Sequence, residues 1–73
     1  RPSSKSIHSP LPGSIIKINF KEGDSFKEGD ILMVMESMKM ENNILAEKNG
    51  VISKVCVQPG AAVLQDDTLF EFV

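Results

Sequence analysis

The hexapeptide Glu-Ser-Met-Lys-Met-Glu at positions 36–41 places Lys39 between two methionines, Met38 and Met40. Methionine side chains gain little by packing at an exposed turn, but they are flexible and form surfaces that adapt to a binding partner. The simpler interpretation is that Lys39 is one of seven ordinary surface lysines. Three unusual features coincide at this point, however, and together they predict a lysine that is presented for recognition.

The first feature is the turn itself. The chain must reverse here, because an apolar run at residues 31–35 precedes Lys39 and the apolar pair at residues 44–45 follows it. The tightest closure puts Met38 and Lys39 at the two central positions of a hairpin. Two-residue hairpins favour Asn-Gly, because type I′ geometry needs a positive φ at both positions. Met and Lys each cost about 1 kcal/mol or more there, and a broken local rule indicates a functional site.

The second and third features are the residues that flank this turn. The same register sets Ser37 opposite Met40 and Glu36 opposite Glu41. Two carboxylates that face each other on one side of a strand pair repel. The like-charge pair costs stability and the exposed methionines gain little by packing, so we expect this hairpin to serve recognition.

Few other residues could support chemistry. Cys56 and His8 are the only residues of their types, so the sequence offers no Cys-His nucleophilic pair and no metal cluster. We expect Cys56 to be a half-buried strand residue and His8 a solvated residue at a loop edge. Asp24 and Asp30 lack the ligand spacing of a calcium loop, and turn formation explains them. The sequence therefore predicts no catalytic residue, no metal and no independent enzyme.

Length and composition exclude several classes of protein. The 73 residues make one small domain with a single core. A net charge of -2, the lack of Trp and Tyr, and the absence of a basic run argue against nucleic-acid binding. The longest apolar run, at residues 31–35, is far short of the roughly 20 residues of a spanning helix, so we expect no direct membrane insertion. A single cysteine favours a reducing, cytoplasmic compartment.

The chain contains an internal repeat. Shifted by 37 positions, residues 13–20 fall on residues 50–57 without a gap, and the match continues to the end of the chain. Six identities join residues 13–36 to residues 50–73, and the apolar positions agree in phase. The sequence therefore contains two copies of one β unit.

Each copy predicts short strands joined by tight turns. Apolar side chains alternate at Ile16, Ile18 and Phe20, which is the pattern of a half-buried strand. Glycine and proline mark the turns that follow. We therefore expect an all-β fold, a flattened β-barrel or sandwich of two quasi-symmetric four-strand halves. The repeat also places the lysine hairpin opposite the termini, with a polar linker tail at residues 1–8 and the domain at residues 9–73.

The hexapeptide resembles the Glu-Ala-Met-Lys-Met signature of the biotinyl domain of biotin carboxyl carrier proteins, in the biotin/lipoyl attachment family. The likeness covers residues 9–73, with a Pro-x-Pro-Gly segment, an apolar strand, Gly-Asp turns and the lysine hairpin in the family order. Ser37 replaces the usual alanine, a small-for-small change. The "thumb" insertion of some acetyl-CoA carboxylase carriers is absent after Phe20, which favours carriers like those of acyl-CoA carboxylases, transcarboxylases or decarboxylases.

The resemblance implies a carrier whose cofactor is biotin, attached covalently to Lys39 by a biotin protein ligase. It implies that Met38 and Met40 are recognition residues. The flanking positions of the hairpin are Glu36, Ser37 and Glu41. The carboxybiotin arm of such a domain shuttles a carboxyl group between biotin carboxylase and carboxyltransferase or decarboxylase sites of partner subunits or domains. The compartment implied is the cytoplasm, or the mitochondrial matrix for a fragment of a eukaryotic carboxylase.

Two alternative functions share this fold. A lipoyl carrier domain also presents a lysine at the tip, but such domains typically have Asp-Lys-Ala there, and the methionine pair argues against it. An unmodified lipoyl-like barrel that serves as an assembly module has no need of an exposed lysine. Both remain alternatives to the biotin carrier at this stage.

Overall fold

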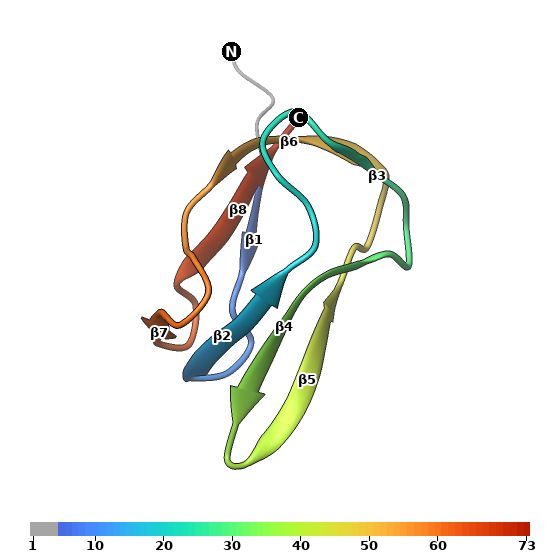
Figure 1. Ribbon diagram of the computed structural model, residues 1–73. Coiled ribbons are helices and arrows are strands. Elements are labelled where there is room, and N and C mark those ends of the chain that lie inside the picture. Colours follow the sequence, from blue (N-terminus) through green and yellow to red (C-terminus); the bar gives the residue numbers. More distant parts are fainter. Residues whose placement is uncertain (1–4) are drawn as a thin grey trace.

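The computed structural model describes residues 5–73, which form eight β-strands in two antiparallel sheets (Figure 1). The strands are β1 Lys5–His8, β2 Gly13–Ile18, β3 Ser25–Phe26, β4 Ile31–Ser37, β5 Met40–Leu45, β6 Gly50–Val55, β7 Ala62–Val63 and β8 Thr68–Phe72. Within residues 5–73 there is no helix with the length and apolar character that crossing a membrane requires. The all-β prediction is confirmed.

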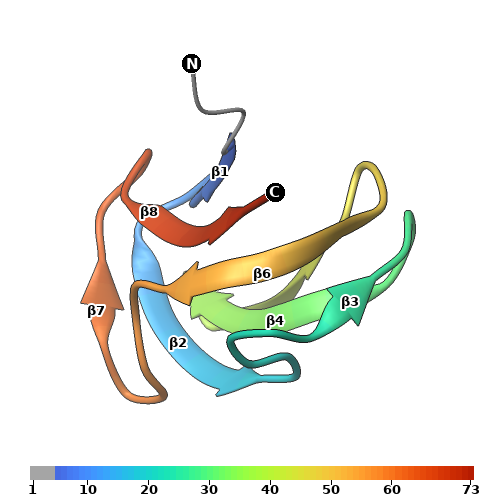
Figure 2. The same ribbon diagram turned by 90° about the horizontal axis from the view of Figure 1, so that it is seen from above.

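The two sheets are built from both halves of the chain. One sheet has the strand order β1-β8-β6-β3 and the other β5-β4-β2-β7, and the two pack face to face in a flattened barrel (Figure 2). Each half, β1–β4 or β5–β8, gives two strands to each sheet. The halves therefore interlock, and neither half has a sheet of its own.

The predicted two-fold repeat is visible in the backbone hydrogen bonds. Backbone hydrogen bonds that involve the turns occur in equivalent pairs. In each pair the two donors are 37 residues apart from each other, and so are the two acceptors. Two such pairs are Gly23 N to Ile52 O (2.8 Å) with Gly60 N to Ile15 O (2.8 Å), and Gly29 N to Ala46 O (2.8 Å) with Asp66 N to Ser9 O (2.7 Å). The duplication in the sequence is thus a duplication of three-dimensional structure.

The core lies between the sheets and combines aliphatic side chains with the buried rings of Phe26, Phe70 and Phe72. The Phe26 ring packs edge-on against Phe72 at a centroid distance of 5.4 Å and against Phe20 at 6.4 Å. Met33 and Met35 are fully buried in β4. Gly50 has no space for a side chain, because a Cβ there would lie 2.8 Å from both the Phe26 and Phe72 rings.

Two expectations for single residues are wrong. Ile16 does not continue an alternating inward pattern, because a bulge between Ile15 and Lys17 shifts the register, leaves Ile16 41% exposed and buries Ile15 instead. A bulge adds one residue to one strand of a pair and so reverses the side-chain phase beyond it. Cys56 is exposed just after the end of β6 rather than half-buried within a strand.

The start of the domain differs from the predicted boundary. Residues 5–8, placed by composition in the linker tail, form β1 and pair with β8 from Lys5 opposite Phe72 to His8 opposite Thr68. This strand is an edge strand with only Ile7 partly buried, so its polar composition resembles that of a linker. Residues 1–4 of the predicted tail lie outside the described residues.

Candidate functional site

The Met38-Lys39 turn has the strained geometry that the sequence predicts. It joins β4 to β5, and the backbone φ is 56° at Met38 and 67° at Lys39. The register sets Ser37 opposite Met40 and Glu36 opposite Glu41, as expected. Both central residues therefore occupy the left-handed region, which residues other than Gly, Asn and Asp avoid.

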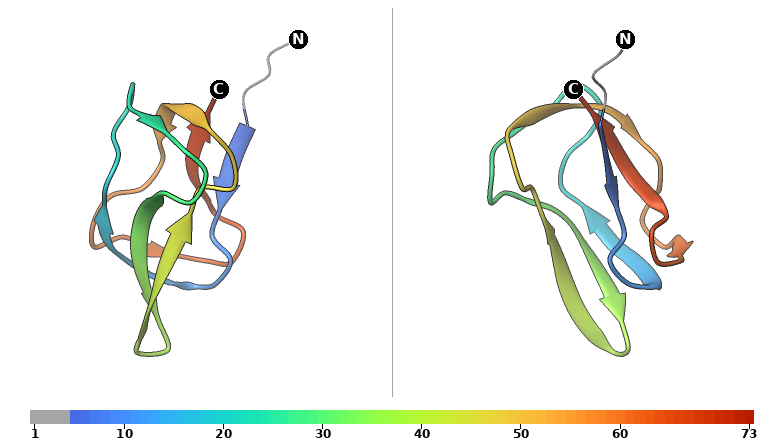
Figure 3. Two further views of the ribbon diagram at one scale, coloured as in Figure 1. Left: turned by 90° about the vertical axis from the view of Figure 1, so that its right-hand side faces the viewer. Right: turned by 180° about the vertical axis from the view of Figure 1, so that it is seen from behind.

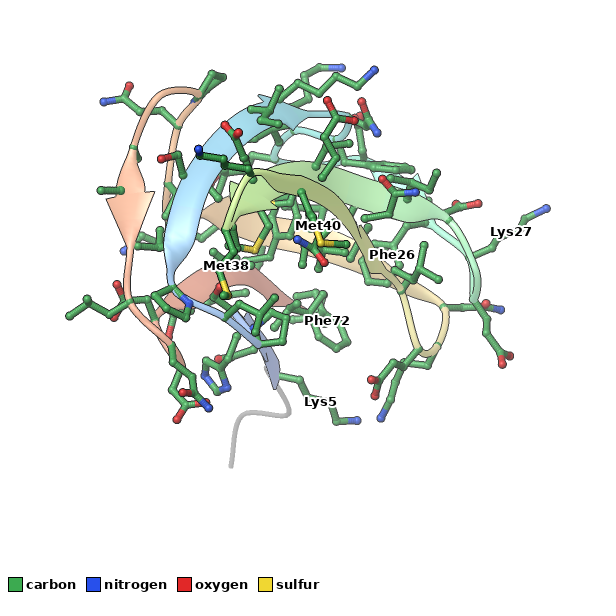
Figure 4. All side chains as sticks on the ribbon, turned by 90° about the horizontal axis from the view of Figure 1, so that it is seen from below. Lys5, Phe26, Lys27, Met38, Met40 and Phe72 are labelled. Atoms are coloured by element: carbon green, nitrogen blue, oxygen red, sulfur yellow. The ribbon has the colours of Figure 1, made fainter. Side chains whose placement is uncertain are left out.

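The four methionines of the chain divide into two groups with opposite environments. Met33 and Met35 are completely buried in the core, whereas Met38 is 90% and Met40 67% exposed. Figure 4 looks at the molecule from below, with the turn toward the viewer and Met38 and Met40 close to it. Side chains with this exposure contribute little packing energy, so their place at the tip is not explained by stability.

The flanks of the turn divide between the inside and the outside of the barrel. Ser37 is 7% exposed and lies on the inward side of β4, in phase with Met33 and Met35. Glu36 and Glu41 are both exposed and face each other across the β4–β5 pair. Ser37 is thus a buried polar residue next to the turn, and the two glutamates give the outer side of the hairpin a local negative charge.

The base of the hairpin is held by the segment between β1 and β2. A Cβ at Gly13 would overlap the backbone carbonyl oxygen of Glu36, so only glycine lets β2 begin this close to β4. The fully buried Ser9 hydroxyl lies 2.6 Å from the carbonyl oxygen of Leu11, to which it donates, and 3.5 Å from the sulfur of Met35. Sequence reasoning did not single out Ser9 and Gly13 as site residues, although Gly13 ends the Pro-x-Pro-Gly segment that it noted and Ser9 directly precedes that segment.

The Lys39 amine is free of ionic contacts. Among residues 5–73 the single ion pair joins Lys21 to Asp24 at 3.3 Å, and Lys39 itself is exposed. The turn lies at one end of the barrel, while Lys5 at the start of β1 and Val73 at the chain's end lie at the other (Figure 1). The lysine is therefore opposite the first and last residues that the structure describes, in a molecule whose longest extent is 38 Å.

A groove of about 390 Å³ lies elsewhere, between the edge strands β1 and β5. The rings of Phe26 and Phe72 form part of its lining, together with Lys5 and His8; Figure 4 shows the two rings and Lys5 on the same side of the molecule. None of residues 36–41 lines it. The groove and the lysine hairpin are thus separate features.

The fold and the hairpin define a class: small two-sheet β domains that present one lysine on a strained turn. The family model for "Biotin-requiring enzyme" proteins, which covers biotin and lipoyl attachment domains, matches residues 5–72. The chain belongs to this biotin/lipoyl attachment family, and it is a carrier domain of the biotin carboxyl carrier type.

Individual relatives agree with the family. The propionyl-CoA carboxylase alpha chain of Ruegeria pomeroyi is 40% identical over 70 residues, which is 96% of this chain and 10% of that protein. The biotin carboxyl carrier protein of Streptococcus mutans is 37% identical over 67 residues, or 92% of this chain and 52% of that protein. A solved single-chain, multi-domain long-chain acyl-CoA carboxylase superposes with a TM-score of 0.94 at 29% identity, over 100% of this chain and 7% of that one. The chain thus spans only part of each relative.

Proposed function

We propose that Lys39 is the biotin attachment residue and that a biotin protein ligase forms the amide at its side-chain nitrogen. The observation that supports this most directly is the turn: Met38 and Lys39 both have a positive φ at the far end of the barrel, with Met38 90% exposed. A protein maintains such strain where the surrounding structure over-determines it and where function requires it.

The residues at the tip fit this covalent group. Acylation needs a neutral, accessible primary amine, and the Lys39 ammonium has no carboxylate partner within residues 5–73 that would have to be displaced. A two-residue turn also projects the amine away from the sheets, so a ligase active site can enclose it without contact with the core. Met38 and Met40 then provide apolar contacts on both sides of the lysine, as the adaptable recognition residues expected from the sequence.

The partners in the proposed cycle are a biotin carboxylase site and a carboxyltransferase or decarboxylase site, on other subunits or on other parts of a longer chain. Biotin supplies a ureido nitrogen that carries a carboxyl group between these sites. The chain itself supplies position: its rigid barrel separates the modified lysine from the termini, and a tether at the termini raises the local concentration of the arm at both sites.

The compartment follows the enzyme to which the domain belongs. We infer either the cytoplasm or the mitochondrial matrix, and several related carboxylase chains are named as mitochondrial. The acceptor of the carboxyl group is a property of the carboxyltransferase partner, and an acyl-CoA ester is the class that the names of the relatives favour.

The experiment that tests this function is intact-protein mass spectrometry with peptide mapping, after co-expression with a biotin protein ligase and free biotin. We expect one biotinyl group, on Lys39, and none in a Lys39→Arg variant, because a guanidinium is not acylated by the ligase. Lys54→Arg is the matched control and should still be modified. An unmodified wild-type chain, beside a control substrate that the ligase does modify, would favour the lipoyl or assembly function instead.

A further inference from the structure

The internal repeat gives the barrel two equivalent corners, each formed by two adjacent turns. The lysine-end corner comprises residues 9–12 and 64–67, and the tether-end corner comprises residues 46–49 and 27–30. Their backbones are held by the same hydrogen bonds, with donors and acceptors 37 residues apart. These are Ser9 N to Asp67 O (2.8 Å) with Ala46 N to Asp30 O (2.9 Å), and Leu64 N to Asp67 Oδ2 (2.8 Å) with Lys27 N to Asp30 Oδ2 (2.9 Å).

The two corners have different side chains at equivalent positions. Leu64 takes the place of Lys27, and Leu11 takes the place of Lys48. Leu64 is 70% exposed and Leu11 37% exposed, whereas both lysines of the tether-end corner are exposed and charged. Since the same turn forms with lysines, folding does not require leucines at the lysine-end corner. Single exposed apolar residues are common, but apolar side chains gathered on one surface mark an interaction site. Leu11 and Leu64 lie in two turns that hydrogen bonds join to each other, so we take them together as a candidate binding surface.

This corner adjoins the base of the lysine hairpin. Gly13 pairs with Val63, and Ser14 pairs both with Ala62 and with Glu36. Extending the β2–β7 register by one step would bring residue 12 opposite residue 64, where the lysine-end corner begins. Figure 3 shows the β1–β2 loop and β7 at the level where the hairpin leaves the barrel. A partner that encloses the turn therefore meets this corner as well.

We propose that Leu11 and Leu64 form part of the docking surface for the biotin protein ligase. The inference rests on the proposed attachment at Lys39. The ligase must reach a nitrogen that is only a four-carbon stem away from the backbone, so its body has to approach the barrel closely. A catalytic site that acts on the end of a much longer biotinylated arm has no such need.

The size of a specific interface supports this assignment. A standard interface covers about 800 Å² on each partner, which corresponds to a disc with a radius of roughly 16 Å. Perpendicular to its long axis, the molecule measures only 22 by 17 Å. An interface of standard size centred on Lys39 therefore covers the whole lysine-bearing end, including the lysine-end corner. The leucines extend the apolar contact beyond Met38 and Met40, on an end of the barrel that also carries Glu36 and Glu41.

The test compares two double variants as substrates of a biotin protein ligase, with biotin and ATP in excess. Leu11→Lys with Leu64→Lys gives the lysine-end corner the side chains of its equivalent. Lys27→Leu with Lys48→Leu makes the reverse change at the tether-end corner. We expect the first variant to raise the KM for the carrier about tenfold, with kcat and melting temperature unchanged. The second variant should keep the wild-type KM.

The outcomes separate this inference from the proposed function. Suppose that the wild-type chain is biotinylated on Lys39 but the Leu11→Lys, Leu64→Lys variant keeps a KM within twofold of wild type. The docking surface is then refuted and the proposed function stands. If the Leu11→Lys, Leu64→Lys variant is biotinylated normally but is then a poor substrate for biotin carboxylase, the lysine-end corner binds a catalytic domain and the ligase assignment is wrong. A wild-type chain that an active ligase leaves unmodified would refute both.

Discussion

The strain at the lysine turn predicts that the protein becomes more stable when its function is removed. The perturbation is the double variant Met38→Asn, Lys39→Gly, which installs the favoured type I′ pair without changing the turn. Met38 and Lys39 have φ values of 56° and 67°, and left-handed backbone costs an L-residue about 1 kcal/mol or more. Met38 is 90% exposed, so its removal forfeits almost no packing.

The expected gain is about 1 kcal/mol in the free energy of unfolding. Relief of two penalties of about 1 kcal/mol is partly offset by the extra freedom of glycine in the unfolded chain, about 0.5–1 kcal/mol. For a domain of this size the melting temperature should rise by about 4–8 °C. Urea denaturation followed by circular dichroism measures the free energy directly, and the m-value should not change.

A matched comparison isolates the strain from other effects of the substitutions. Lys39→Arg keeps the backbone geometry and the charge, so its stability should equal that of the wild type. Asp66→Gly changes a third residue with positive φ, 73°, to the residue found at its equivalent, Gly29. Since Asp tolerates this conformation better than Met or Lys, the gain there should be under about 0.5 kcal/mol. A double variant at the lysine turn that is no more stable than wild type would refute the idea that the turn stores strain.

Three further predictions concern single residues. Met40→Ala should change the melting temperature by less than about 2 °C, because the side chain is 67% exposed; a larger drop in a thermal melt would show that Met40 packs. Gly13→Ala should destabilise the domain by at least about 2 kcal/mol in urea denaturation, because a Cβ there overlaps the carbonyl oxygen of Glu36, and wild-type stability would contradict that contact. The backbone N–H of Lys21, aided by its ammonium, lowers the pKa of the Asp24 carboxyl below its ordinary 3.8. Its contribution is therefore present above pH 3.8 and lost as the pH falls through the lowered pKa, so Asp24→Asn should flatten the acid end of the stability curve measured between pH 2 and 5, and an unchanged curve would contradict it.

Much of the fold could be predicted because the chain repeats itself. The offset of 37 residues relates the two halves, and glycines at equivalent positions mark the turns: Gly23 and Gly60 have φ values of 91° and 89°. The hairpin register also followed from the sequence, since an apolar run before Lys39 and a strand after it leave room for only a two-residue turn.

The errors of sequence reasoning arise where phase or composition misleads. A bulge after Ile15 shifts the side-chain phase of β2. The sequence Ile15-Ile16-Lys17 alone does not show that Ile16 is the extra residue. The edge strand at residues 5–8 pairs on one side only, so it needs few apolar side chains and resembles a tail. Ser9 and Gly13 support the hairpin through contacts with Met35 and Glu36. Such contacts between residues far apart in the sequence appear only in three dimensions.

The two-fold repeat also explains why the lysine hairpin has no counterpart within residues 5–73. The β4–β5 turn joins the first half to the second, and the equivalent connection would have to join the end of β8 to the start of β1, which lie close together (Figure 1). A pseudo-two-fold barrel made from one chain must have a closed turn at one end and its termini at the other. The place farthest from any tether is therefore a connection that the fold already requires. The β4–β5 turn is held by six paired positions of the two strands that it joins. The proposed attachment site is therefore well supported by the sheet as well as distant from a tether at the termini.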